Sequence, residues 1–201
     1  EIFSNLGILE SIEALNPTRL CGVALSAYER SYLQVDYPDT VDGRTMTSLS
    51  VERSILDDLM INQVRNSNIQ LMEGFKVTDL LFDGGNVCGV KGRDETKTKF
   101  SIKAKVVIDG GGRNSISLRR LNLRRGYPGK GKIALAAHWE GVKELGSYCY
   151  MHISHPGYTG IAPVGHNRAN VVLVVDRSHL IGVSVEQFFM KTVLGNRLRK
   201  R

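Results

Sequence analysis

A run of glycines between an apolar stretch and an expected helix start is the part of this sequence best suited to bind a nucleotide. Residues 106–108 are apolar and β-branched, which predicts a buried strand of a parallel sheet. Three glycines follow at 110–112, and Asn114 and Ser115 can then cap a helix. Glycines let a ligand approach the backbone closely, and a helix N-terminus favours negative charge. The alternative is a tight turn that binds nothing, because a glycine-rich turn alone is a weak signal.

A helix pattern led by an arginine comes earlier in the chain. Arg53, Leu56, Asp57 and Leu59 are spaced along one expected helix over residues 51–66. The helix dipole disfavours a cation in the first turn, so the charge of Arg53 needs a reason. One reason is a salt bridge to Asp57, four residues further on. The other is contact with an anionic ligand, for which a guanidinium is well suited.

Taken in order, this helix, a hairpin and the turn from Asp109 to Ser115 resemble the p-hydroxybenzoate hydroxylase-like flavoproteins. That family includes the geranylgeranyl reductases and the flavin-dependent halogenases. Its members show an Arg-x-x-Leu-Asp-x-x-Leu helix, and then a strand that ends in Asp-Ala-Asp-Gly-x-x-Ser. Here the helix has one residue fewer before its last leucine, and Gly111 stands where the family has its second acid. Because that acid would bind a ribityl hydroxyl, its loss predicts altered flavin affinity or geometry.

The resemblance implies a mixed α/β fold, in which part of a Rossmann-like FAD/NAD(P)-binding domain is interleaved with an antiparallel-sheet substrate domain. Residues 1–20 and 50–125 would belong to the first domain, and residues 21–49 and 126–201 to the second. It further implies an FAD-dependent oxidoreductase that uses NAD(P)H as co-substrate and acts on a small molecule of apolar or aromatic character. The choice among oxygenation, double-bond reduction and halogenation stays open, as does the oligomeric state.

The resemblance also implies which residues contact the cofactor, although it identifies no general acid or base. Val77 would meet the adenine through its backbone, a contact that leaves no side-chain signature. The cofactor-binding residues are expected to be Arg53, Val77, Asp109, Gly110, Gly111, Gly112 and Ser115.

Two segments typical of the family are absent from these 201 residues. One is the Gly-x-Gly-x-x-Gly turn on which the FAD pyrophosphate rests. The other is a later Gly-Asp segment on the flavin side of the pyrophosphate. We therefore interpret the chain as an internal piece of a larger flavoprotein, and expect it to bind FAD weakly or not at all by itself.

The stretch from Tyr158 to Pro163 falls where geranylgeranyl reductases show Tyr-x-Trp-x-Phe-Pro. Tyr158 and Pro163 match, whereas Gly160 and Ala162 replace two large residues, which implies a wider substrate pocket facing the flavin. The alternative is an ordinary edge strand that ends at a proline. His138 is a further candidate pocket residue, although a lone histidine more often satisfies a local hydrogen bond. The histidine spacing is not that of a metal site, so we predict no metal.

The overall composition is that of a folded, water-soluble protein, with 42% hydrophobic and 23% charged residues. No apolar run approaches the roughly 18 residues that a membrane-spanning helix needs. Cys21, Cys88 and Cys149 are widely spaced, which favours reduced thiols and a cytoplasmic location.

The net charge of +7 is concentrated in basic clusters, one of which runs from Arg113 to Lys132 and includes Arg120. Its simplest interpretation is a solvated surface, and no motif typical of nucleic-acid binding accompanies it, so we expect no nucleic-acid partner. Two alternatives to a flavoenzyme stay open. One is a non-catalytic binding module of the same fold, and the other is a basic interaction protein.

The elements that must position these residues are indicated by periodicity. Asp83-Gly-Gly-Asn86 predicts a hairpin turn between strands over 77–82 and 87–90. From Ile133 the apolar residues alternate with a period of two, which predicts a separate antiparallel sheet over 133–175. A short helix is expected over 185–194.

Overall fold

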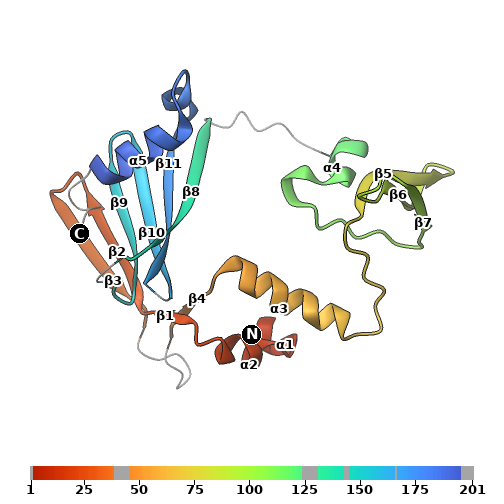
Figure 1. Cartoon of the computed structure of the whole chain (residues 1–201), viewed down its shortest axis with the longest axis horizontal. Coiled ribbons are helices and arrows are strands. Elements are labelled where there is room, and N and C mark those ends of the chain that lie inside the picture. Colours follow the sequence, from red (N-terminus) through yellow and green to blue (C-terminus); the bar gives the residue numbers. More distant parts are fainter. Residues whose placement is uncertain (1, 39–45, 124–130, 143–144, 166, 196–201) are drawn as a thin grey trace. The chain divides into compact units, whose positions relative to one another are not determined.

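The computed structural model describes residues 2–38, 46–123, 131–142, 145–165 and 167–195. Contacts divide the chain into two compact units (Figure 1). The first unit comprises Glu1–Gln63 and Gly129–Arg201, and the second comprises Val64–Pro128. The predicted division into an FAD domain and a substrate domain, with boundaries at residues 20, 50 and 125, stays a prediction.

A six-stranded sheet dominates the first unit, and its strands lie in the order β3-β2-β9-β10-β11-β8. The strands are β2 (Gly22–Ala27), β3 (Ser31–Asp36), β8 (Lys132–Glu140), β9 (Tyr148–Ser154), β10 (Gly157–Gly165) and β11 (Arg168–Asp176). Strands β8 to β11 are mutually antiparallel neighbours, which confirms the predicted antiparallel pairing over 133–175. The sheet is larger than the predicted one, because β2 pairs with β9 in parallel and joins residues 22–36 to it.

One face of this sheet is covered by the helix α5 (Val185–Gly195), which confirms the helix expected over 185–194 (Figure 1). Alternate residues of β11 are buried, and they pack with Phe189 and Val193 of the helix. This alternation arises because successive side chains of a strand point to opposite faces. The buried strand residues are Ala169, Val171, Leu173 and Val175.

The first unit contains further elements that lie outside the large sheet. They are α1 (Ile2–Asn5), α2 (Leu9–Ala14), β1 (Thr18–Leu20), β4 (Ser48–Ser50), α3 (Arg53–Arg65) and a 3₁₀ turn, η2 (Arg177–Leu180). Strands β1 and β4 pair antiparallel as a separate two-stranded sheet. Helix α3 confirms the helix expected over 51–66. No helix in the described part of the chain is long and apolar enough to cross a membrane.

The second unit is built on a three-stranded meander of β5 (Lys76–Asp83), β6 (Asn86–Arg93) and β7 (Lys99–Lys103). The predicted hairpin is confirmed, since Asp83 pairs with Asn86 across a two-residue turn. Gly84 and Gly85 in that turn have φ of +53° and +85°. Positive φ at both central residues is what a tight hairpin turn requires, and glycine adopts it without a steric penalty.

The predicted parallel strand over residues 106–108 is wrong. These residues form no regular element, and Val106 and Ile108 are 74% and 92% exposed. A parallel strand obtains its hydrogen bonds and its burial from strands on either side. No described strand pairs with this segment, so its apolar sequence alone cannot make it a strand. It leads into a 3₁₀ turn, η1 (Gly112–Asn114), and the short helix α4 (Ile116–Arg120).

Candidate functional site

The carboxylate of Asp109 organises the glycine turn from inside. Its Oδ1 accepts the Gly111 N–H at 2.8 Å, and its Oδ2 accepts the Ser115 hydroxyl at 2.7 Å and the Ser117 N–H at 2.8 Å. These donors, the Ser115 hydroxyl foremost, hold the pKa of Asp109 well below its usual range because each one favours the ionised form. Asp109 is therefore already occupied as an acceptor within its own turn.

Ser115 caps the helix that follows, as the sequence predicts. Its Oγ accepts the Leu118 N–H at 3.1 Å while its hydroxyl donates to Asp109, and the residue is only 8% exposed. Gly112 adopts φ of +58°, a conformation that favours glycine. A Cβ built on Gly111 would lie 2.9 Å from Oδ1 of Asp109 and 3.2 Å from the Cα of Ser115. An acid at position 111, as in the resembling family, would therefore require the Asp109 carboxylate to move from the place that it takes in this turn.

A cavity of about 1140 Å³ lies against this turn, wholly within the second unit. The structure brings five of the predicted cofactor residues to its wall: Val77, Asp109, Gly110, Gly111 and Ser115. Gly112 is part of the same turn but does not line the cavity. The wall also has an apolar side that includes Leu80 and Ile116, so it offers both apolar contact and backbone approach.

The cavity wall is rich in cations. Four basic residues line it, and none of the four makes an ion pair with a described residue: Lys76, Arg93, Arg113 and Arg119. Unpaired cations beside an apolar wall suit a ligand with phosphates and a ring, as in an FAD molecule. The fit is incomplete for the ribityl chain, because Gly111 has no carboxylate and that of Asp109 is already hydrogen-bonded.

Arg53 opens helix α3 in the first unit, whereas the other six predicted cofactor residues belong to the second. The predicted grouping of all seven therefore stays a prediction. The Arg53 side chain is 81% exposed, and its Nε lies 2.5 Å from Oδ1 of Asp57. The salt bridge that the sequence offered as an alternative is thus present. Glu52, just before Arg53, pairs at 2.5 Å with Arg168 of β11, which ties the start of α3 to the large sheet.

The predicted pocket residues of β10 lie mostly on one side of the large sheet. Tyr158, Gly160 and Ala162 alternate along the strand, on the face opposite α5. His138 of β8 shares that face, since Ala162 pairs with Asn170 and Asn170 pairs with His138. A Cβ at Gly160 would meet no atom within 4 Å, so this face is open there. Asn170, which sequence reasoning missed, lies between Ala162 and His138.

Pro163 lies on the other face of the sheet. It pairs with Ala169, which is completely buried beneath α5. Strand alternation places neighbouring residues on opposite faces, so Ala162 and Pro163 cannot both face one pocket wall within a regular strand. The geometry thus favours four of the five predicted pocket residues as a shared surface.

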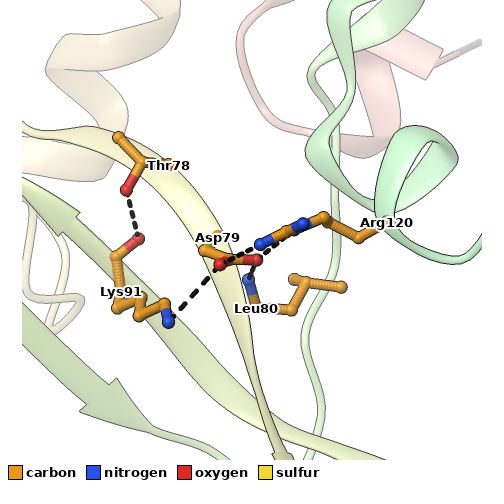
Figure 2. Close-up of polar contacts among 5 residues, drawn as sticks. All are labelled: Thr78, Asp79, Leu80, Lys91 and Arg120. Atoms are coloured by element: carbon orange, nitrogen blue, oxygen red, sulfur yellow. Dashed lines mark hydrogen bonds and ion pairs between the residues drawn. The ribbon is translucent and has the colours of Figure 1, made fainter.

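The sequence suggested that Arg120 is a solvated member of a basic run. The structure instead shows it in an ion pair. Figure 2 shows its guanidinium reaching from α4 to both carboxylate oxygens of Asp79 in β5. The Leu80 N–H also donates to Oδ1 at 2.9 Å, and the Lys91 Nζ lies 3.4 Å from Oδ2. The Asp79 side chain is only 15% exposed. This fork clamps the helix that follows the glycine turn onto the meander, and sequence patterns do not signal a pair separated by 41 positions.

The same clamp should make the second unit sensitive to acid. The Arg120 guanidinium, with help from the Leu80 N–H and Lys91, holds the pKa of Asp79 well below its ordinary value. A depressed carboxyl pKa stabilises the folded state above about pH 4, and the contribution is lost as the pH falls through the lowered pKa. We expect Arg120→Ala to lower the thermal unfolding midpoint at about pH 7. The decrease of that midpoint from about pH 7 to about pH 3 should then be smaller in the variant than in wild type. Arg65→Ala, which removes a more exposed pair with Glu73, is the control. Identical pH profiles for Arg120→Ala and wild type would contradict the clamp.

Removing the charge of Asp109 should loosen the turn without unfolding the meander. In Asp109→Asn an amide NH₂ replaces one acceptor oxygen, so at least one of the three donors loses its acceptor. We expect faster amide hydrogen exchange at Gly111 and Ser117, with the exchange of β5 and β6 unchanged. Asp83→Asn, at the exposed end of the hairpin, is the matched control. Unchanged exchange at both amides would show that the carboxylate does not hold the turn.

No protein-family model matches the chain, and no curated protein matches it in sequence. Solved structures do match its fold. The myxobacterial chondrochloren halogenase CndH, described as a new variant of FAD-dependent halogenases, superimposes with a TM-score of 0.83 at 18% identity, over 99% of this chain and 47% of its own. The chain has the fold of FAD-dependent halogenases. The predicted α/β fold class and the resemblance to this group of flavoproteins are thereby confirmed at the level of fold.

Other solved structures show the same fold. A flavoprotein/dehydrogenase from Cytophaga hutchinsonii matches with a TM-score of 0.83 at 16% identity, over 98% of this chain and 49% of its own. A geranylgeranyl bacteriochlorophyll reductase-like protein from Thermoplasma acidophilum matches with a TM-score of 0.71 at 16% identity, over 92% of this chain and 47% of its own. The chain thus spans about half the length of each of these proteins.

Proposed function

We propose that this chain forms part of an FAD-dependent oxidoreductase that acts on a small apolar or aromatic molecule. The observation that carries the proposal is the fold, which coincides with about half of an FAD-dependent halogenase and places a glycine turn beside a cation-lined cavity. Flavin, when bound, would supply the redox chemistry, and NAD(P)H would be its reductant. Oxygenation, halogenation and double-bond reduction are the candidate reactions.

The protein's own residues would bind and orient the cofactor in this proposal. The Arg53 guanidinium would contact a phosphate in exchange for Asp57, because its fork matches two phosphate oxygens. The backbone of Val77 and the turn at 110–112 would allow close approach to the nucleotide. The cations on the cavity wall, Arg113 and Arg119 among them, would offset the phosphate charge.

The open face of the large sheet would form one wall of the substrate site. Gly160 and Ala162 leave space there, and Tyr158 and His138 border it with polar groups. Apolar neighbours such as Val172 on the same face suit an apolar or aromatic substrate. A cytoplasmic location belongs to the same proposal.

A non-catalytic module of the same fold is the second candidate. It is favoured by Gly111, where the family has an acid, and by the internally satisfied Asp109. Visible flavin absorption in the purified full-length protein, together with flavin-dependent oxidation of NAD(P)H, is the deciding experiment. Flavin absorption with NAD(P)H oxidation supports the enzyme. Flavin binding without any redox turnover supports the module, and the absence of flavin binding would remove the proposal.

A further inference from the structure

The meander of the second unit has one face on which five of the nine residues in three successive rows are basic. Its strand register places Lys76, Arg93 and Lys99 side by side, one on each strand. The next row on that face contains Asp79, Lys91 and Ser101, and the row after it contains Leu81, Gly89 and Lys103. We call the five basic residues of these rows the lysine face: Lys76, Lys91, Arg93, Lys99 and Lys103.

Like charges directly opposite each other on paired strands destabilise a sheet. All five basic residues are exposed, and only Lys91 has an ion pair with a described residue. That pair is with Asp79, the sole acid of the three rows, whose carboxylate already binds the Arg120 fork. Four of the five therefore have no ion pair with a described residue, two of them (Lys76 and Arg93) also line the cavity, and the lysine face keeps a net positive charge on an exposed surface. Charge of this kind attracts and orients an anionic partner.

The side chains of the lysine face favour some classes of anionic partner over others. Sheets that bind single-stranded nucleic acid stack bases on aromatic side chains, and none of the three rows contains one. Two phenylalanines of this unit lie away from these rows: Phe100 pairs with Gly92 on the opposite face and contacts Phe75 edge-on at 5.2 Å. Amphipathic insertion into a bilayer needs an apolar side chain among the cations. The only apolar side chain in the three rows is that of Leu81, which is only partly exposed.

We propose that the lysine face is a docking surface for an acidic protein. Basic residues in register across neighbouring strands, as in the row of Lys76, Arg93 and Lys99, lie about 5 Å apart and can meet carboxylates distributed over a protein surface. Gly89 and Ser101 are small, so neighbouring lysine side chains stay accessible. The association would be steered by charge and would weaken with salt, because exposed charges are screened beyond about 10 Å at 0.1 M ionic strength.

The test uses the full-length protein and a fluorescent glutamate-rich peptide as the probe, with binding followed by fluorescence anisotropy. The test variant is Lys91→Gln with Lys99→Gln and Lys103→Gln, which leaves the cavity-lining Lys76 and Arg93 in place. The control variant removes the same charge from exposed cations outside the meander: Arg30→Gln, Arg177→Gln and Lys191→Gln. We expect the test variant to lose about tenfold in affinity at low salt and the control variant less than about threefold. Circular dichroism of both variants excludes unfolding.

Parallel titrations with a duplex DNA and with phosphatidylserine vesicles decide the class of partner. Tighter binding of the peptide than of either alternative, with the loss confined to the test variant, supports the proposal. Equal losses in the two variants would show that only net charge matters and would overturn it. Tighter binding of DNA or vesicles, lost in the test variant, would assign the face to that partner and overturn the proposal as well.

Discussion

Leu173→Ala should lower the free energy of unfolding of the first unit by about 2–5 kcal/mol. Leu173 has no exposed surface and lies at the centre of β11, paired with Thr159 on one side and Leu135 on the other. Truncation removes apolar contacts and leaves a cavity beneath α5, since the paired strands on both sides limit collapse. Urea unfolding of the 201-residue chain, followed by circular dichroism, should show a lower midpoint with an unchanged slope.

Leu33→Ala is the matched control for that variant. Leu33 lies on the edge strand β3 of the same sheet and is 58% exposed, so its truncation should cost less than about 0.5 kcal/mol. The comparison keeps the chemistry of the change constant and varies only burial. Equal shifts of the urea midpoint in the two variants would contradict the core that we describe.

Arg53→Ala should weaken FAD binding by the full-length protein about tenfold to a hundredfold. The estimate is the loss of one charge-assisted contact, worth about 1.5–3 kcal/mol. Arg53→Lys should not restore full affinity if the contact is bidentate, because an ammonium group lacks the guanidinium fork. Dissociation constants for flavin, measured by fluorescence quenching on folded variants, test both statements.

Two controls separate a cofactor contact from a structural one. Asp57→Ala removes the ion pair of Arg53 but keeps its guanidinium, so FAD affinity should be retained or improved. Arg65→Ala removes a cation from the other end of the same helix and should leave FAD affinity unchanged. Arg120→Ala is unsuitable as a neutral control, because Arg120 holds α4 against β5 beside the cavity. Unchanged affinity in Arg53→Ala would remove Arg53 from the site. An equal loss in Asp57→Ala would assign the effect to the helix.

Local sequence patterns predicted correctly the elements that are stabilised by residues near them in the chain. The hairpin of β5 and β6 follows from Gly84 and Gly85, whose positive φ a tight turn needs. The strict alternation of apolar and polar residues in β8 predicts a strand with one covered face. In the structure, exposed and half-buried residues alternate along this strand. The cap at Ser115 is equally local, since its acceptor and donor lie three residues apart.

The sequence by itself therefore determined the α/β class, the hairpin, helices α3 and α5, and the strands β8 to β11 of the large sheet. Only the tertiary structure decided that β2 joins β9 in parallel and that Arg120 clamps Asp79. It also decided that residues 106–108 are no strand, although their composition is that of one. The physical reason is the same in each case. Turns and caps are stabilised by neighbours in the chain, whereas strand pairing and ion pairs depend on groups that the sequence places far away.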